Sequence, residues 1–180
     1  MAHPSDILAF WYDPQHKAKL FKSDDAFDAQ IRKNFEATAI DLAAGKLKWN
    51  ETPDACLAKI IVLDQFPRNM YRGTKAAFAW DHLALRAAQD MIEKGWDLKI
   101  TQDKRAFIYM PFMHAENKTM QAKCVELVDS RLDDAGTLHH AREHEKVIKR
   151  FGRFPHRNDI LGRESTEEEI EFLQSGGYAP

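Results

Sequence analysis

The chain has 180 residues, of which 44% are hydrophobic and 30% are charged. A chain of this length can bury about 70% of the surface that it exposes when unfolded, so it needs no disulfide or metal to fold. The composition excludes a disordered chain, and the net charge of −2 excludes a global field that would attract nucleic acid or an anionic membrane. We therefore expect a single domain over residues 1–180, with no nucleic-acid partner and no membrane partner.

Three features bear on the cellular compartment. Cys56 and Cys124 fall inside helical patterns and are expected to be small buried residues kept reduced. The opening MAHPSDILAFWYDP lacks a basic region before its short apolar run, so it does not resemble a signal peptide. No apolar stretch approaches the roughly 18 residues that a membrane span needs. Together these features predict a cytoplasmic protein.

Polar residues with a side-chain oxygen stand before successive apolar runs, as is typical of helix N-caps. In chain order, the expected helices begin near Ser5, Asp24, Thr52, Thr74, Thr101, Asn117, Thr137, and Ser165 or Thr166. The third is apolar on nearly all sides and should be buried, with a turn at residues 66–73, and the fourth should continue to about Lys94. Pro111 predicts a kink or break in the fifth.

No segment alternates with a period of two, so strands are not expected. The predicted fold class is all-α: a single-domain bundle of about eight helices packed as antiparallel hairpins because their connections are short.

The segment RFGRFPHRN, residues 150–158, carries the most chemically capable residues of the chain. Between Lys146 and Arg163, six fixed positive charges stand against one negative charge, Asp159, and His156 adds a titratable donor. Phe and Gly residues between these charges predict a bent loop that pins its Arg side chains. Pinned guanidinium groups can bind a carboxylate or phosphate of a ligand. They can equally bind the protein's own carboxylates and helix C-termini, and both interpretations stay open.

Two further polar clusters follow apolar helices. One lies at residues 64–72, where the polar groups mark either a capped turn or the floor of a pocket, and the other is formed by His114 and Glu116. If these helix ends lie on one side of the bundle, they converge with the late segment into an Arg- and His-lined pocket for a small anionic metabolite. The candidate ligand-binding residues are Asp64, Arg68, Arg72, His114, Glu116, His144, Arg150, Arg153, His156 and Arg157.

The segment from His140 to His144 matches the H-x-x-E-H pattern of inverted zinc peptidases, in which two His bind zinc and the Glu acts as a general base. Glu143 is as easily a surface residue beside Arg142, and a third protein ligand would be needed. We therefore predict no metal site and no cofactor, and keep zinc-dependent hydrolysis through His140 and His144 only as a third alternative.

Several motifs resemble a bacterial family of unknown function, family 924. They are DILAFWY near the start, LDQFPRNMYRG (63–73), YMPFMHAE (109–116) and RFGRFPHRNDILGRESTEEEIEFL (150–173). The resemblance implies an all-helical fold similar to tetratricopeptide-repeat proteins, and it implies no established activity, substrate or cofactor. The residues that match the late motif are His144, Arg150, Arg153, His156, Arg157, Asn158 and Arg163, whereas His140 does not match it.

The sequence therefore predicts binding of a small anionic metabolite, with its turnover left open and no catalytic residue assigned. The alternative is a tetratricopeptide-like module that holds a protein or peptide partner on a helical surface.

Overall fold

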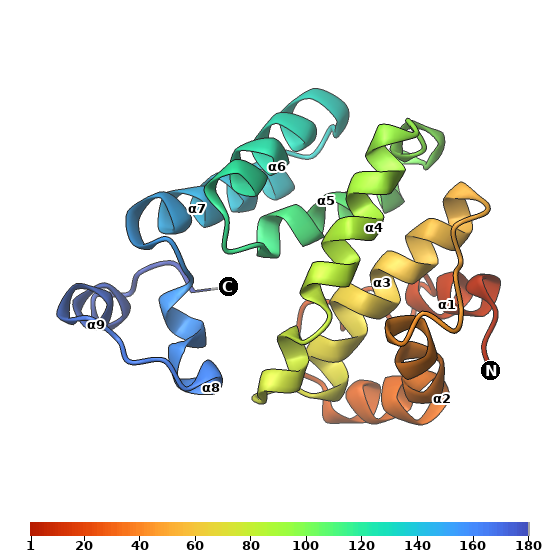
Figure 1. Ribbon diagram of the computed structural model, residues 1–180, viewed down its shortest axis with the longest axis horizontal. Coiled ribbons are helices and arrows are strands. Elements are labelled where there is room, and N and C mark those ends of the chain that lie inside the picture. The colour runs from red at the N-terminus through yellow and green to blue at the C-terminus, as the bar shows by residue number, and fades with distance from the viewer. Residues whose placement is uncertain (180) are drawn as a thin grey trace. The chain divides into compact units, whose positions relative to one another are not determined.

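The protein is all-helical in the computed structural model, which describes residues 1–179 (Figure 1). Its α-helices are α1 (Pro4–Trp11), α2 (Asp25–Ala43), α3 (Pro53–Met70), α4 (Asp81–Glu93), α5 (Gln102–His114), α6 (Lys118–Arg131), α7 (Ala135–Phe151), α8 (Asn158–Leu161) and α9 (Glu167–Gln174). Short 3-10 helices are η1 (Lys75–Phe78), η2 (Asp97–Lys99) and η3 (Pro155–Arg157), and no strand occurs in the described residues. The all-α prediction is confirmed, while the likeness to tetratricopeptide repeats stays a prediction.

The helices group into two compact units, the first formed by residues 1–101 and the second beginning at Gln102. The expectation of one domain stays a prediction. None of the helices in the described part of the chain has the length and apolar character that a bilayer crossing requires.

In the first unit, α3 packs against α1, α2 and α4 (Figure 1). It is buried on nearly all sides, as its apolar sequence predicts. Phe66 of α3 lies with its ring centroid 5.6 Å from that of Trp11 and 5.3 Å from that of Phe35. Stacked and tilted aromatic pairs of this kind contribute about 0.5–1.5 kcal/mol each beyond the area they bury.

The turn predicted at residues 66–73 is only partly correct, because α3 continues through Pro67 to Met70. Phe66, Pro67 and Met70 are buried, and the Nδ2 of buried Asn69 donates to Asp28 Oδ1 at 2.7 Å. Tertiary burial therefore extends the helix across residues whose local preference is for a turn.

Two other predictions about helix bounds are wrong, and a third is wrong in one of its two alternatives. Thr74 does not begin a long helix: its Oγ1 donates to the carbonyl of Tyr71 at 2.7 Å, and the single 3-10 turn of η1 precedes α4. α7 begins at Ala135, two residues before Thr137, because the carboxylate of Asp134 accepts from the backbone N–H groups of Gly136 and Thr137. Pro111 does not break α5, which continues to His114 with buried residues on both sides of the proline, while the kink that was the alternative stays a prediction.

In the second unit, α6 packs against both α5 and α7 (Figure 1). α7 ends at Gly152, whose φ of 74° lies in the left-handed region that favours glycine. The chain then bends into a segment that we call the C-terminal arm, residues 152–179, which contains η3, α8 and α9.

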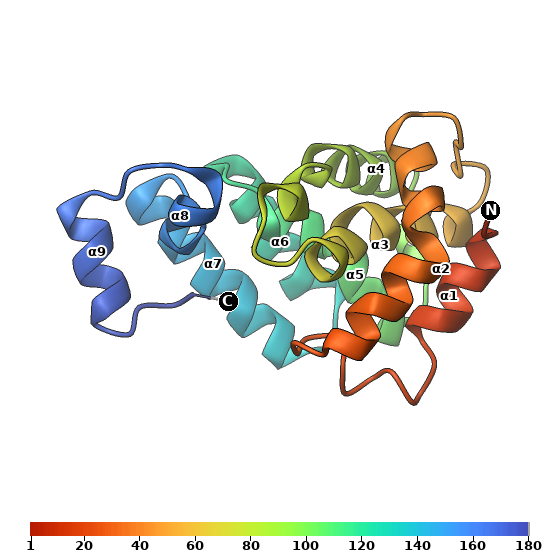
Figure 2. The same ribbon diagram turned by 90° about the horizontal axis from the view of Figure 1, so that it is seen from below.

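The arm is held against α7 by apolar contacts. Phe154 forms a core cluster with Val147 and Ile148 of α7, and Phe151, Phe172 and Tyr178 pack against this cluster. Figure 2 shows the segment after α9 running back to α7. The arm therefore folds as a loop that closes on the helix from which it departs.

Candidate functional site

The positive charges predicted between residues 146 and 163 are largely matched by carboxylates that lie outside that segment. The ion pairs, at 2.6–2.8 Å, are Lys146–Glu143, Lys149–Glu145, Arg150–Glu168, Arg153–Glu169 and Arg163–Glu116. The Arg150 guanidinium also lies 4.7 Å from the ring centroid of Phe151. Carboxylates of the protein itself thus pair with most of the cations that the sequence offered as ligand-binding groups.

Glu169 is the centre of one network in the arm. Its side chain is 2% exposed and accepts from Arg153 Nε at 2.6 Å, Arg153 Nη2 at 2.7 Å, the backbone N–H of Thr166 at 2.8 Å and Asn158 Nδ2 at 3.2 Å. The hydrogen bonds from Arg153 are the main cause that lowers the pKa of Glu169 to about 2. A single buried carboxylate therefore ties α9 to the loop after α7 and to α8.

Glu116, at the end of the α5–α6 connection, is the centre of a second network. It accepts from Arg163 Nη1 at 2.6 Å, Arg163 Nη2 at 2.9 Å and the backbone N–H of Phe154 at 2.7 Å. Burial acts to raise the pKa of Glu116, but the hydrogen bonds from Arg163 and Phe154 outweigh it and the pKa lies below its ordinary value. Glu116 was a predicted ligand-binding residue, and the contacts that it makes hold the C-terminal arm.

His144 and Tyr178 form a contact between α7 and the end of the arm. The Nδ1–H of His144 donates to the carbonyl of His140 at 2.8 Å, which is consistent with a neutral ring, and the Tyr178 hydroxyl lies 3.3 Å from the same nitrogen. Burial first, and the nearby His114 second, lower the pKa of His144 to about 3. His144 is therefore a neutral, packed histidine near pH 7.

The same contacts bear on the zinc alternative. The Tyr178 hydroxyl lies 2.8 Å from His140 Nδ1, so both histidines of the H-x-x-E-H pattern already have hydrogen-bond partners at Nδ1. Lys146 binds Glu143 at 2.6 Å. Within residues 1–179, no three His, Cys, Asp or Glu side chains are grouped so that they could hold a metal ion. These observations give the zinc interpretation no support.

Two neighbouring residues of η3 face different surroundings. Arg157 is 6% exposed, donates from Nη1 to the carbonyl of His114 at 3.1 Å, and lies 4.5 Å from the ring centroid of Phe154. His156 is half-buried, and burial together with the charge of Arg157 lowers its pKa to about 4. Its Nδ1 is buried and makes no hydrogen bond within the described residues. His156 is thus a neutral ring with one unused nitrogen.

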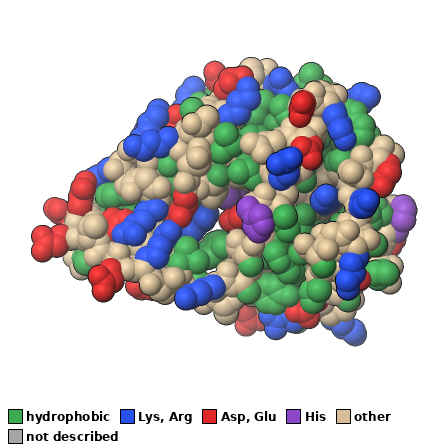
Figure 3. All heavy atoms as spheres, in the orientation of Figure 1, with side chains coloured by type: hydrophobic (Ala, Val, Ile, Leu, Met, Phe, Trp, Pro, Cys, Tyr) green, Lys and Arg blue, Asp and Glu red, His purple; other side chains and the backbone are tan. Residues whose placement is uncertain are grey.

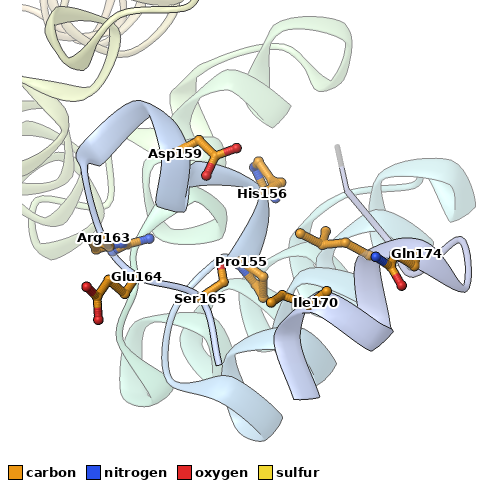
Figure 4. A pocket seen from close by; sticks show the side chains of 9 residues that line it. Pro155, His156, Asp159, Arg163, Glu164, Ser165, Ile170 and Gln174 are labelled. Atoms are coloured by element: carbon orange, nitrogen blue, oxygen red, sulfur yellow. The ribbon is translucent and has the colours of Figure 1, made fainter. Parts of the chain in front are cut away.

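A pocket of about 700 Å³ lies within the arm, between η3–α8 on one side and α9 on the other. Figure 4 shows Asp159 and His156 along one wall, with Ile170 and Gln174 of α9 across from them. The lining residues are Pro155, His156, Asp159, Arg163, Glu164, Ser165, Ile170, Leu173 and Gln174. We call this the arm pocket; it combines acidic, neutral polar and apolar side chains.

In the first unit, the predicted Arg residues are also held by carboxylates. Arg68 donates to both oxygens of Asp81, at 2.8 and 2.9 Å, and Arg72 donates to those of Asp28, at 2.9 and 3.2 Å. Arg68 also donates to the backbone carbonyl of Asp64, a fully buried residue. A smaller pocket of about 400 Å³ is lined by Asp25, Asp28, Ala29, Arg32, Lys33, Asn69, Met70 and Arg72.

Comparison with known proteins places this structure in a family. Residues 7–177 match the model of a family described as bacterial proteins of unknown function, DUF924. The chain belongs to the DUF924 family. The DUF924 chain is also similar to the solved structure of a protein of unknown function, ATU0120, from Agrobacterium tumefaciens. The two share 40% sequence identity with a TM-score of 0.91, over 96% of this chain and 97% of that one. No curated protein matches the chain.

The predicted site residues of this DUF924 protein lie in different places in the structure. His156 lines the arm pocket, and Arg72 lines the smaller pocket of the first unit. Glu116 and Arg153 bind residues of the arm-pocket wall, Arg163 and the carbonyl of Glu164. The convergence of residues 64–72 with those of the second unit stays a prediction.

Sequence reasoning missed the residues that form most of the arm pocket in the DUF924 protein. From the sequence, Asp159 was noted only as the single negative charge of a basic segment. Ile170 and Leu173 lie one helical turn apart on α9, and that spacing signals a shared apolar face. That spacing could have indicated one wall of the pocket, but not its opposite wall on η3 and α8.

Proposed function

We propose that this DUF924 protein binds a small organic molecule in the arm pocket. The observation that carries the proposal is a cavity of about 700 Å³ with pinned polar groups and an apolar wall, which is within the size range of small-molecule sites. The proposal concerns binding and assigns no catalytic residue.

Two polar side chains of the arm pocket, Arg163 and Ser165, are held in place before any ligand arrives. Arg163 uses its Nε to bind Asn158 Oδ1 at 3.0 Å, and its Nη atoms bind Glu116 and the carbonyl of Phe154. Ser165 Oγ accepts from Asn158 Nδ2 at 2.9 Å, which leaves its O–H as a donor. Groups that are already fixed lose little entropy on binding, so they favour affinity.

The apolar wall of the arm pocket can be obstructed by a single substitution. Ile170 is 44% exposed, so Ile170→Trp should place a bulky ring over this wall without disturbing the core, and Ile40→Trp, at a residue 47% exposed on α2, is the matched control. A library of metabolites is screened by thermal shift against the three proteins. A ligand at 100 times its Kd stabilises a protein by about 2.7 kcal/mol.

We expect at least one compound to stabilise the wild type and Ile40→Trp but not Ile170→Trp. If no compound raises the melting temperature, or if Ile170→Trp responds as the wild type does, the arm pocket is not the binding site.

The predicted anion binding has a second candidate location, in the smaller pocket of the first unit. Arg32, Lys33 and Arg72 outnumber Asp25 and Asp28 there, so this wall carries a net positive charge. Phosphorus NMR with inorganic phosphate tests it: line broadening should be lost in Lys33→Gln and retained in Lys149→Gln, and equal broadening in both would exclude this location. No specific contact favours the peptide-binding alternative, which stays a prediction.

A further inference from the structure

The charges in the wall of the arm pocket are mainly negative. Asp159 and Glu164 are exposed, and neither side chain has an ion-pair partner among residues 1–179. The one guanidinium in the wall, that of Arg163, is already paired with both oxygens of Glu116. The two open carboxylates therefore set the sign of the electrostatic potential at this wall.

The groups that would favour an anion there are either uncharged or in use. His156 is neutral near pH 7 because burial lowers its pKa. The positive end of α9 is capped, since Thr166 Oγ1 accepts from the backbone N–H of Glu169 and the Glu169 carboxylate accepts from that of Thr166. Figure 3 shows further acidic side chains gathered over α9, at the left of the view. An anion would meet repulsion and few unused donors.

The opposite wall offers hydrocarbon surface. Ile170 and Leu173 line the pocket one turn apart on α9, and Pro155 adds a third apolar group. Ile170 remains 44% exposed although it is a large hydrophobic residue, so covering it would be favourable. A ligand that fits both walls carries a positive charge at one end and an apolar body.

We propose that the ligand of the arm pocket is an organic amine, with its ammonium group at Asp159 and its hydrocarbon part against Ile170 and Leu173. This inference rests on the proposed function, and it replaces the small anion that the sequence predicted by a ligand of opposite charge. The ammonium donates to the carboxylate of Asp159, which Figure 4 shows beside His156, while Glu164 adds negative charge at the edge of the pocket. The unused hydroxyl of Ser165 and the amide of Gln174 are available to a further polar group of the ligand.

Three probes of equal chain length separate charge from hydrophobicity: hexylamine, hexan-1-ol and hexanoate. Each is titrated into the isotopically labelled full-length protein, and the backbone amide shifts of the arm-pocket residues are followed by NMR. We expect hexylamine to bind up to about fivefold more tightly than hexan-1-ol, and hexanoate to bind most weakly, because an exposed ion pair contributes up to about 1 kcal/mol. Added salt should weaken hexylamine binding and leave hexan-1-ol binding unchanged.

Two variants localise the effect. Asp159→Asn should reduce hexylamine affinity to about that of hexan-1-ol, whereas Glu171→Gln, an exposed acid of α9 outside the pocket lining, should leave it unchanged. If hexanoate or hexan-1-ol binds more tightly than hexylamine, the amine inference is overturned while small-molecule binding stands. If none of the three probes shifts the arm-pocket amides, the amine inference and the proposed function are both overturned.

Discussion

Replacing Glu169 by Gln should destabilise the second unit far more than the same change at the neighbouring Glu168. Glu169 is 2% exposed and binds Arg153 through two hydrogen bonds of 2.6 and 2.7 Å, in addition to those from Thr166 and Asn158. Gln keeps the shape of the side chain but removes its charge and turns an amide N–H₂ toward donors. Breaking a buried, hydrogen-bonded ion pair costs about 3–5 kcal/mol, and we expect about 3 kcal/mol because Arg153 is partly exposed.

The control variant, Glu168→Gln, makes the same chemical change in an ion pair that is exposed. Glu168 lies on the same helix and binds Arg150 at 2.8 Å, but both side chains are more than half exposed. Exposed ion pairs contribute about 0–1 kcal/mol, so Glu168→Gln should change the free energy of unfolding by less than about 1 kcal/mol.

Urea unfolding of both variants, followed by far-UV circular dichroism, measures the two free energies. Similar losses for Glu169→Gln and Glu168→Gln would refute the inference that the Glu169 network anchors the arm. A double-mutant cycle that adds Arg153→Gln isolates the pair itself, and its coupling energy should account for most of the effect.

Three further predictions concern pH, the arm and the domain organisation. Burial lowers the pKa of His144 to about 3 and of His156 to about 4, so the unfolded chain binds more protons below the ordinary value of 6.5. Urea titrations should show full stability above that value and a loss of up to about 1.4 kcal/mol per pH unit per histidine as pH falls to about 4; constant stability would contradict this. Gly177→Ala would place a Cβ 2.5 Å from Phe172, so the Tyr178 ring should leave α7 and its NMR signals should shift; unchanged signals would disprove the contact. All four Trp residues precede Gln102, so Trp fluorescence reports on the first unit, whereas circular dichroism reports on the helices of both units. A single domain should give the same unfolding midpoint with both probes, and two midpoints would show independent units.

Local hydrogen bonding made much of the fold predictable. Asn117 caps α6 by accepting from the backbone N–H groups of Thr119 and Met120, and Thr166 caps α9 in the same manner. Such bonds involve residues two or three positions apart, so the sequence displays both partners.

The errors arose where distant residues decide the local structure. α3 continues through Pro67 because the surrounding residues are buried, and burial depends on helices elsewhere in the chain. Thr74 resembles an N-cap in sequence, yet its hydroxyl bonds backward to Tyr71. Propensity identifies residues that can begin or end a helix, but tertiary contacts select among them.

The site illustrates the same limit. The sequence correctly indicated that the Arg residues after α7 are pinned, but their carboxylate partners lie up to 47 positions away, as in Arg163–Glu116. Because those partners were not visible, the sequence left open whether the local positive charge binds a ligand or the protein's own carboxylates. The arm pocket arises only when α9 folds back, and that arrangement depends on the distant contact between Glu169 and Arg153.

The most direct test of small-molecule binding is a crystal structure of the protein soaked with a panel of small amines, alcohols and carboxylic acids. We expect electron density for a soaked compound in the arm pocket, with contacts to Asp159 and Ile170. Density for soaked compounds only at other places on the protein, with the arm pocket filled by water alone, would contradict the proposed function.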